Sequence, residues 1–279
     1  MKSIFCSALL LLSFFAGARA QEPVPLAHGN VPGESNHHLK IENEYVRVYY
    51  VEVPPHEATQ LHQHDYDYIY VSLGPSDVVN AIVNKPEIHL QFKDGETHFT
   101  RGGFAHIARN LADTPFRNIT IELLKPQGEP HNWCDEVVPN APTDCRESSH
   151  EGTKMVSSFR TEEIKVFSEI LDPKASSKWN AFSPILVVAL DQSQIRVSFD
   201  KQTENLSADG ILWIPGRSNH EVRKVVFVNQ QKGISRLLMI LFEGEGPKRF
   251  LTRPRGCLSP SHLQHFSLDW CLSMRQYGG

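Results

Sequence analysis

Two histidines separated by one residue, His62 and His64, form the clearest chemical pattern in the sequence. They begin the run 62–71, which is rich in β-branched and aromatic residues and is therefore expected to form a strand. Successive side chains of a strand point to opposite faces, so the two imidazoles would share one face. On the same face would follow Tyr66, Tyr68 and Tyr70. Imidazole is the commonest metal ligand in proteins, and the pair predicts half of a metal site.

A third histidine, His106, is predicted to complete this site. It lies about 40 residues further on, in the glycine-containing segment 95–110. That separation suits a small antiparallel barrel in which the two segments become neighbours. A second interpretation stays open, in which the histidines line a barrel and bind only backbone or water. The remaining histidines nearby lie outside the pattern and are expected at the surface or, for the last, beside a ligand: His56, His89 and His98.

Short strands are the elements that must position these residues. Segments rich in β-branched and aromatic residues recur along the chain and are separated by Pro, Gly, Asn and Asp. This rhythm predicts an all-β sandwich or barrel. The expected strand segments are 45–53, 62–71, 78–83, 88–92, 117–124, 163–167, 184–190, 194–199, 209–220 and 235–242.

The later strands repeat the earlier ones at weak similarity, which predicts an internal duplication. We align 46–49 with 164–167, 70–73 with 187–190, and His106 with His220. Trp179 and Ala181 fall near the positions of the paired histidines. The second half therefore lacks the residues of a tight metal site and is expected to be metal-free and structural.

The N-terminus indicates export. A short basic start, an apolar stretch over 4–17 and Ala18-Arg19-Ala20 form a secretory signal peptide with cleavage near Ala20. The mature chain is expected to be secreted or periplasmic, and no later segment is apolar enough for membrane insertion. The formal net charge is −4 with scattered basic residues, which disfavours nucleic acid as a partner.

Four of the five cysteines follow the signal peptide. In an oxidising compartment an even number favours disulfides, and four cysteines allow three pairings. We favour the local pairs Cys134–Cys145 and Cys257–Cys271, because each brackets one short loop. A Cys/His zinc site is the alternative, although neither pair has the spacing of thiolate metal clips.

The first half resembles the cupin family, and the duplication makes the chain resemble a bicupin. The family's second motif is matched by Gly95, Gly103, His106 and Asn110, with Arg101 at the proline position. Its first motif, H-x-H followed by a glutamate and a glycine, is matched by His62, His64 and a nearby Gly74. Tyr68 occupies the glutamate position, and Asp67 lies beside it. The resemblance covers most of 45–124 and is weaker in the second half.

The resemblance implies two tandem cupin (double-stranded β-helix or jelly-roll) barrels with one divalent transition metal in the first. Its ligands would be His62, His64 and His106, and the metal would be Fe, Mn, Ni, Cu or Zn. The fourth ligand stays open between Tyr68, which parity favours, and Asp67, which would need a bulge to reach the site. A site of three histidines alone is also chemically sound. Tyr68 is the candidate catalytic residue, as a ligand or a proton donor.

The function implied is that of an exported metal-dependent enzyme, a dioxygenase or isomerase, acting on a small organic molecule in the first barrel. The alternative is a non-catalytic cupin that binds a small molecule or a metal, and a homodimer is compatible with either. The expected segments are a signal peptide (1–20), an extended arm (21–40), the metal-binding barrel (41–126), a cysteine-containing linker (127–155), the degenerate barrel (156–245) and a cysteine-containing tail (246–279).

Overall fold

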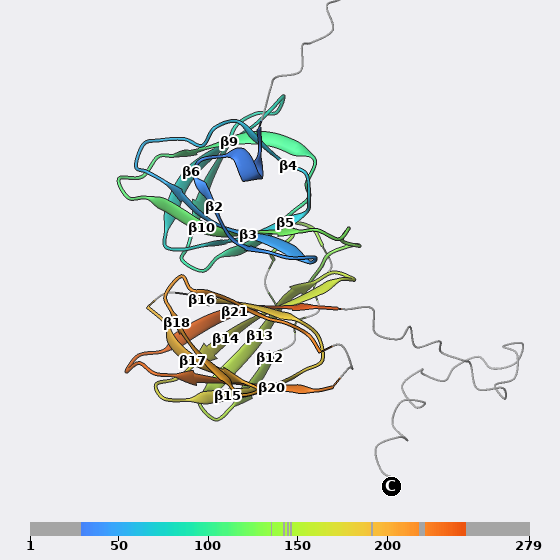
Figure 1. Ribbon diagram of the computed structural model, residues 1–279. Coiled ribbons are helices and arrows are strands. Elements are labelled where there is room, and N and C mark those ends of the chain that lie inside the picture. The colour runs from blue at the N-terminus through green and yellow to red at the C-terminus, as the bar shows by residue number, and fades with distance from the viewer. Residues whose placement is uncertain are drawn as a thin grey trace, which may run out of the picture.

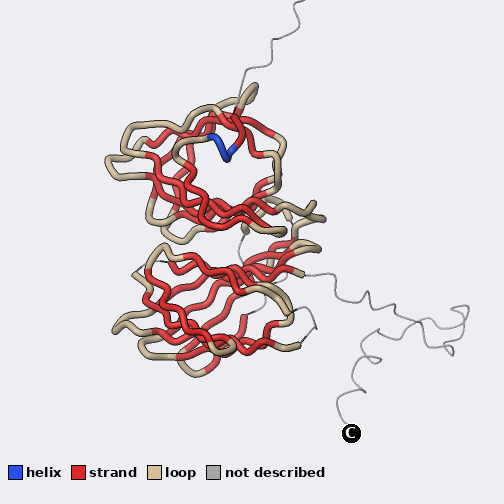
Figure 2. The backbone as a smooth tube through the Cα atoms, in the orientation of Figure 1, coloured by secondary structure: helices blue, strands red, loops and turns tan. Residues whose placement is uncertain are grey.

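The computed structural model describes residues 29–134, 136–141, 143, 145, 147–190, 192–217 and 221–243. The described chain is almost entirely strand and forms two barrels, one above the other in Figure 1. Among the described residues the one helical element is the short 3-10 helix η1 (Val31–Gly33), which is drawn in blue within the outline of the first barrel in Figure 2. The predicted all-β fold of two tandem barrels is confirmed. The predicted signal peptide, Cys257, Cys271 and His220 lie outside the described residues.

The first barrel is built from two five-stranded sheets. One sheet has the order β1 (Gly29–Asn30), β4 (His62–His64), β9 (Phe104–Asn110), β6 (Ser76–Ile82) and β7 (Ile88–Phe92). The other has the order β2 (His37–Glu42), β3 (Val46–Val53), β10 (Phe116–Leu123), β5 (Tyr68–Ser72) and β8 (Thr97–Thr100).

The second barrel repeats this arrangement after a connection that contains β11 (His131–Asn132) and β12 (Glu147–His150). Its larger sheet contains β11, β13 (Thr153–Arg160), β14 (Ile164–Leu171), β21 (Ser235–Phe242), β16 (Ile185–Leu190) and β19 (Ile211–Ile214), with β12 paired to β13. Its smaller sheet contains β15 (Ser176–Ala181), β20 (Arg223–Asn229), β17 (Gln194–Phe199) and β18 (Gln202–Ser207).

The two barrels share one hydrophobic core. Alternate residues of β3 and β10, such as Val48 and Ile121, face the second barrel and pack with Val166 and Ile240 in one buried cluster. The intervening residues of the same strands, such as Val51, face the inside of the first barrel. Because one face of β10 packs against the second barrel and the other lines the inside of the first, β10 is buried along nearly its whole length.

The predicted strand 62–71 is in fact two strands in different sheets, β4 and β5. The chain turns between them, where Asp67 accepts hydrogen bonds from the Gly102 amide at 3.0 Å and from Arg101 at 2.8 Å. A Cβ on Gly102 would lie 2.4 Å from the Tyr66 carbonyl oxygen, so this approach requires glycine. Tyr66 consequently points outward, over Arg47, and the prediction that it shares a face with the histidines is wrong.

Two buried asparagines show how the barrels correspond. The Asn110 amide donates to the carbonyls of Val53, Pro54 and Thr114, and the Asn229 amide donates to those of Leu171, Asp172 and Gly233. This match and the strand registers confirm the alignments of 46–49 with 164–167 and of 70–73 with 187–190. They make Val225, four residues before Asn229, the equivalent of His106 in the second barrel. The predicted correspondence of His106 with His220 is therefore wrong.

The connections differ from the predicted segments in two places. Residues from Gly29 onward, expected in the extended arm, form β1, η1 and the start of β2, which pairs with β3. The linker 127–155 contains short strands, and Cys134 and Cys145 form the expected disulfide. Among the described residues, no helix is long and apolar enough to cross a membrane.

Candidate metal centre

Strand register brings the three predicted histidine ligands together inside the first barrel. β4 and β9 pair antiparallel with His62 opposite His106, and the ring of His64 lies 5.1 Å from that of His62 between centroids. The Nε2 atoms of His62 and His106 are 3.1 Å apart. All three side chains are buried. The sequence motif therefore does form one cluster.

The opposite nitrogens of two of these rings are held by hydrogen-bond acceptors. The His62 Nδ1–H donates to the Gln60 carbonyl at 2.8 Å, and the His106 Nδ1–H donates to the Asn80 side-chain oxygen at 2.7 Å. A neutral imidazole has one N–H, so each ring presents an Nε2 lone pair to the centre of the cluster. Tying down one nitrogen in this way is how proteins usually orient a metal-binding histidine.

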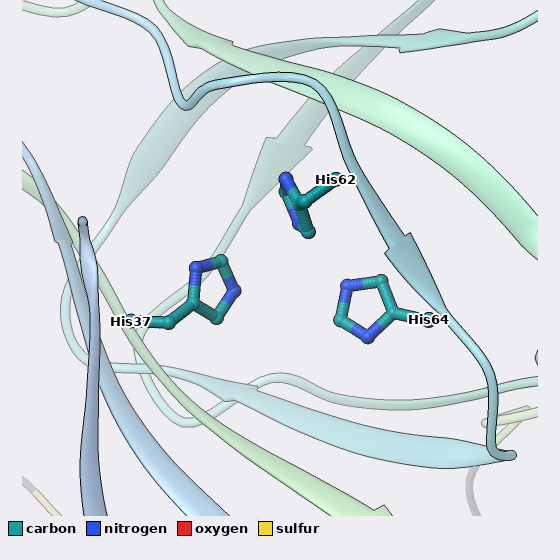
Figure 3. Close-up of side chains that lie close together, drawn as sticks. All are labelled: His37, His62 and His64. Carbon is teal, nitrogen blue, oxygen red and sulfur yellow. The ribbon is translucent and has the colours of Figure 1, made fainter. Parts of the chain in front are cut away.

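His37 is a fourth histidine in the cluster, and the sequence analysis missed it. It begins β2, its side chain is 5% exposed, and its Nδ1–H donates to the Glu34 carboxylate at 2.6 Å. One ring nitrogen from each of His37, His62 and His64 lies within 4.8 Å of the others. Figure 3 shows the three rings gathered around one centre. A polar N-terminal segment without periodicity gave no signal for this role.

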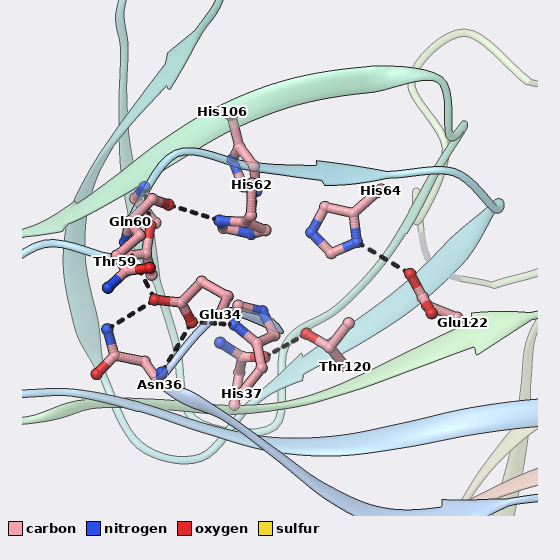
Figure 4. Close-up of polar contacts among 12 residues, drawn as sticks. Glu34, Asn36, His37, Thr59, Gln60, His62, His64, His106, Thr120 and Glu122 are labelled. Carbon is pink, nitrogen blue, oxygen red and sulfur yellow. Dashed lines mark hydrogen bonds and ion pairs between the residues drawn. The ribbon is translucent and has the colours of Figure 1, made fainter. Parts of the chain in front are cut away.

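Glu34 holds His37 in place. Besides the ring, its carboxylate accepts from the Asn36 backbone and side-chain nitrogens and from the Gln60 amide at 3.0 Å (Figure 4). Although burial alone would raise the pKa of Glu34, the hydrogen bonds with His37 and with the backbone at Gln60 lower it to about 2. Glu34 is therefore a fixed anion that ties the segment before β2 to the loop before β4.

The electrostatics of the cluster favour neutral rings. Burial, and then the charge of the neighbouring histidines, lowers the pKa of His62 to about 4 and of His106 to about 3. The pKa of His64 is also well below its ordinary value, mainly through burial. At neutral pH the rings keep free lone pairs, as metal ligands must.

The donor atoms fit a transition metal. Two imidazole nitrogens bound at about 2.1 Å to one ion lie roughly 3.0–3.4 Å apart in octahedral or tetrahedral geometry. The 3.1 Å between the His62 and His106 Nε2 atoms falls in this range. Because both Nδ1 atoms donate elsewhere, neither neutral ring has a proton to place between these two lone pairs. A cation at the centre would satisfy both.

The two residues considered as the fourth ligand lie differently. Asp67 binds Arg101 and the Gly102 amide in the turn and does not reach the cluster. Tyr68 stacks on the His64 ring at 4.2 Å between centroids. Burial raises the pKa of the Tyr68 phenol, against a hydrogen bond with Thr100 that lowers it. A neutral phenol suits the role of hydrogen-bond or proton donor.

The cluster opens onto a cavity of about 430 Å³ inside the first barrel. Its walls are mostly apolar and aromatic, including Tyr70, Phe92 and Phe104, with Asn118 and Thr120 as uncharged polar groups. Arg101 borders it, but its guanidinium already donates to Asp67 and to the carbonyls of Gln127 and Gly128. The size is within the range of small-molecule sites.

The second barrel has none of these imidazoles at the matching positions. Register places Met155, Trp179, Ala181 and Val225 where the first barrel has His37, His62, His64 and His106. The sequence alignment of Trp179 and Ala181 with the paired histidines is thus confirmed. In their place the Trp179 indole donates to the buried Glu169 carboxylate at 3.1 Å.

Glu169→Gln is expected to remove a pH dependence of stability. Burial raises the pKa of Glu169, against hydrogen bonds from Ser177 and Trp179 that lower it. The unfolded chain therefore loses the Glu169 proton at a lower pH than the folded chain does. As pH rises from the unfolded to the folded pKa of Glu169, the wild type loses stability. Calorimetric Tm values of both proteins between about pH 4 and 8 test this. A wild-type-minus-variant difference in Tm that stays constant would contradict it.

Comparison with known proteins supports the fold and nothing narrower. No protein-family model matches the sequence, and no curated protein matches it significantly. Among solved structures, AerE from Microcystis aeruginosa superposes with a TM-score of 0.53 at 13% identity, covering 75% of this chain and 97% of that one.

Two further structures show the same arrangement. The vicilin from Solanum melongena, described as having different anionic ligands in structurally similar pockets, has a TM-score of 0.53 at 12% identity over 72% of this chain and 76% of its own. Bacillus subtilis oxalate decarboxylase, described as having Mn(II) centres, has a TM-score of 0.50 at 11% identity over 74% and 75%. The two tandem all-β barrels, the H-x-H pair beside a third histidine and the structural neighbours all point to the same fold. The fold of this chain is that of the two-barrel cupins.

Proposed function

We propose that the first barrel binds one divalent transition metal and that the mature chain is a metal-dependent enzyme of the oxygenase type, acting on a small organic molecule. The observation that supports the metal is the convergence of four imidazoles with buried side chains, those of His37, His62, His64 and His106. At least three present Nε2 because Nδ1 donates to an acceptor. Imidazole donors suit Fe, Ni, Cu and Zn, and Mn remains a candidate.

The bound ion would supply Lewis-acid and, for a redox metal, electron-transfer chemistry. The chain's own residues would do the rest. The apolar walls around Phe92 and Phe104 would bind the ligand and exclude water, and the Asn118 and Thr120 side chains would orient it. Tyr68, beside His64 on the cavity wall, would donate a hydrogen bond or proton to the bound molecule.

We also propose that this chemistry takes place after export. The signal-like N-terminus motivates this, and the Cys134–Cys145 disulfide suits an oxidising compartment. The predicted cleavage near Ala20 is tested by N-terminal sequencing of the protein recovered from the periplasm or culture medium. A protein retained inside the cell with Met1 intact would exclude export.

A non-catalytic binding protein is the second candidate. It is favoured by the absence of imidazoles from the matching positions of the second barrel and by Tyr68 in place of the expected glutamate. In this case the first barrel would hold a small molecule or the metal itself without turnover. The cavity and the four histidines serve either function.

The experiment that separates these functions starts from the protein spanning 21–279, purified metal-free and reconstituted in turn with Fe, Mn, Ni, Cu and Zn. Elemental analysis gives the metal content, and an oxygen electrode follows uptake with a panel of small aromatic and aliphatic compounds. About one ion per chain with substrate-dependent oxygen uptake supports the enzyme. Stoichiometric capture of a compound without turnover supports the binding protein. No metal after every reconstitution overturns the metal centre.

His37→Ala is expected to weaken metal binding by at least roughly tenfold, since even the loss of an outer partner of a ligand commonly costs that much. Affinity is measured by competition of a chromophoric chelator for Co²⁺ or Zn²⁺. His38→Ala is the matched control, because His38 is the next residue of β2 and is exposed. Equal affinities of the two variants would show that His37 is not a ligand.

A further inference from the structure

Glu122 is a buried carboxylate beside the histidine cluster that the proposed function has not used. It lies on β10 between Arg47 of β3 and Tyr68 of β5, its direct neighbours in register. Its side chain is 2% exposed and points into the first barrel, toward His64 (Figure 4). Its Oε1 is 3.7 Å from the His64 Nδ1, and its Oε2 is 3.9 Å from the Arg47 guanidinium.

Unsatisfied polar atoms gather at this place. Among the described residues, few buried side-chain atoms lack a hydrogen-bond partner, and three of them belong to Tyr49, His64 and Glu122. They are the tyrosine hydroxyl, the His64 Nδ1 and the Glu122 Oε2. Buried polar atoms without partners are costly, so a group of them calls for a physical explanation. A donor–acceptor chain from Tyr49 through Glu122 to His64 would satisfy all three.

His64 differs from the other histidines of the cluster because its Nδ1 has no acceptor at hydrogen-bond distance. Nδ1 of His37, His62 and His106 donates to an acceptor at 2.6 to 2.8 Å. His64 has Glu122 in the corresponding place, at the longer distance of 3.7 Å. In the second barrel both members of this pair are replaced together, by Ala181 and Leu241. The carboxylate therefore occurs where the histidine occurs.

We infer that Glu122 is the positioning residue for His64: it accepts the Nδ1–H, fixes the tautomer and turns Nε2 to the metal. This inference rests on the proposed metal centre. The carboxylate lies on β10, next to Tyr68 of the paired strand β5. It would act through His64 rather than as a metal ligand. An outer carboxylate of this kind raises the basicity of the histidine it holds.

The test compares Glu122→Gln, Glu122→Asp and wild type, all metal-free and then titrated with Co²⁺ or Cu²⁺ alone. Glu122→Gln is expected to weaken Co²⁺ binding roughly 10- to 100-fold and to change the nitrogen hyperfine pattern of bound Cu²⁺ in EPR. Glu122→Asp keeps the carboxylate and should recover part of the affinity. Glu169→Gln, the same substitution at a buried strand position of the second barrel, should change neither reading.

Each outcome has one meaning. If wild type binds no Co²⁺ or Cu²⁺, the proposed metal centre fails. If wild type binds and Glu122→Gln matches it in affinity and EPR spectrum, the inference about Glu122 is overturned while the centre stands. If Glu122→Gln lowers the Tm of the metal-free protein but leaves the Cu²⁺ spectrum of its folded fraction unchanged, Glu122 is only structural and the inference is likewise overturned.

Discussion

The His62→Ala/His64→Ala variant is expected to lose its metal, from about one ion per chain to almost none. The double substitution removes two of the four imidazoles of the cluster. One of them is His62, whose Nε2 lies 3.1 Å from the His106 Nε2 in the wild type. The two remaining imidazoles, His37 and His106, lie on separate strands of different sheets and cannot complete a tetrahedral or octahedral set. Elemental analysis after reconstitution and dialysis measures the loss, and circular dichroism checks that the barrels are still folded.

The matched control is His56→Ala/His89→Ala. These histidines are exposed and each pairs with an aspartate, Asp113 or Asp77, away from the cluster. This control removes the same number of imidazoles and should keep the full metal content. Equal metal content in both double variants would show that the ion binds elsewhere on the chain, and the proposed centre would be abandoned.

The parts of the site that follow from the sequence are those with a fixed local spacing. His62 and His64 lie two residues apart on one strand, and His106 lies at a set distance from Gly103 and Asn110. Local spacing of this kind survives folding, because each strand presents alternate residues to one face. The cluster of these three histidines was predicted from it, and the register of β4 with β9 places them together.

His37 and Glu122 could not be predicted because tertiary contacts alone give them their positions. His37 lies in a polar segment, and its place in the cluster depends on the pairing of β2 with β3 and on the hydrogen bonds of Glu34 with Asn36, His37 and Gln60. Glu122 lies in an alternating polar and apolar strand, which usually means one face in water. Here both faces are buried, one against the second barrel and one in the cavity, so the apparent surface residue is an internal one.

The error at 62–71 has a similar cause. β-Branched and aromatic residues continue through the run, and propensity alone indicates one strand. The turn at 65–67 is stabilised by the distant residues Arg101 and Gly102, through hydrogen bonds to Asp67. Tyr68 nevertheless reaches the cavity, because β5 crosses to the other sheet and turns the same parity inward again.

The paired variants Asn110→Ala and Asn229→Ala are expected to destabilise the protein alike but to differ in metal binding. Each loses one side-chain NH2 that donates to three carbonyls at 2.8–3.1 Å, and a side-chain oxygen that accepts the backbone amide of Ala112 or Gln231. The Asn229 oxygen also accepts from the Ser235 hydroxyl at 2.9 Å. Unpaired buried groups cost about 1–3 kcal/mol each, and partial access of water should leave a loss of roughly 2–4 kcal/mol in each variant.

The metal readings should separate the two variants because Asn110 ends the strand that carries His106, whereas Asn229 ends the strand that carries Val225. Loosening β9 should weaken Co²⁺ binding, and loosening β20 should leave it unchanged. Denaturant unfolding gives the stability loss, and chelator competition at a temperature where both variants are folded gives the affinity. If both lower the affinity equally, the two barrels act as one cooperative unit through their shared core, and the metal centre depends on the second barrel as well as the first.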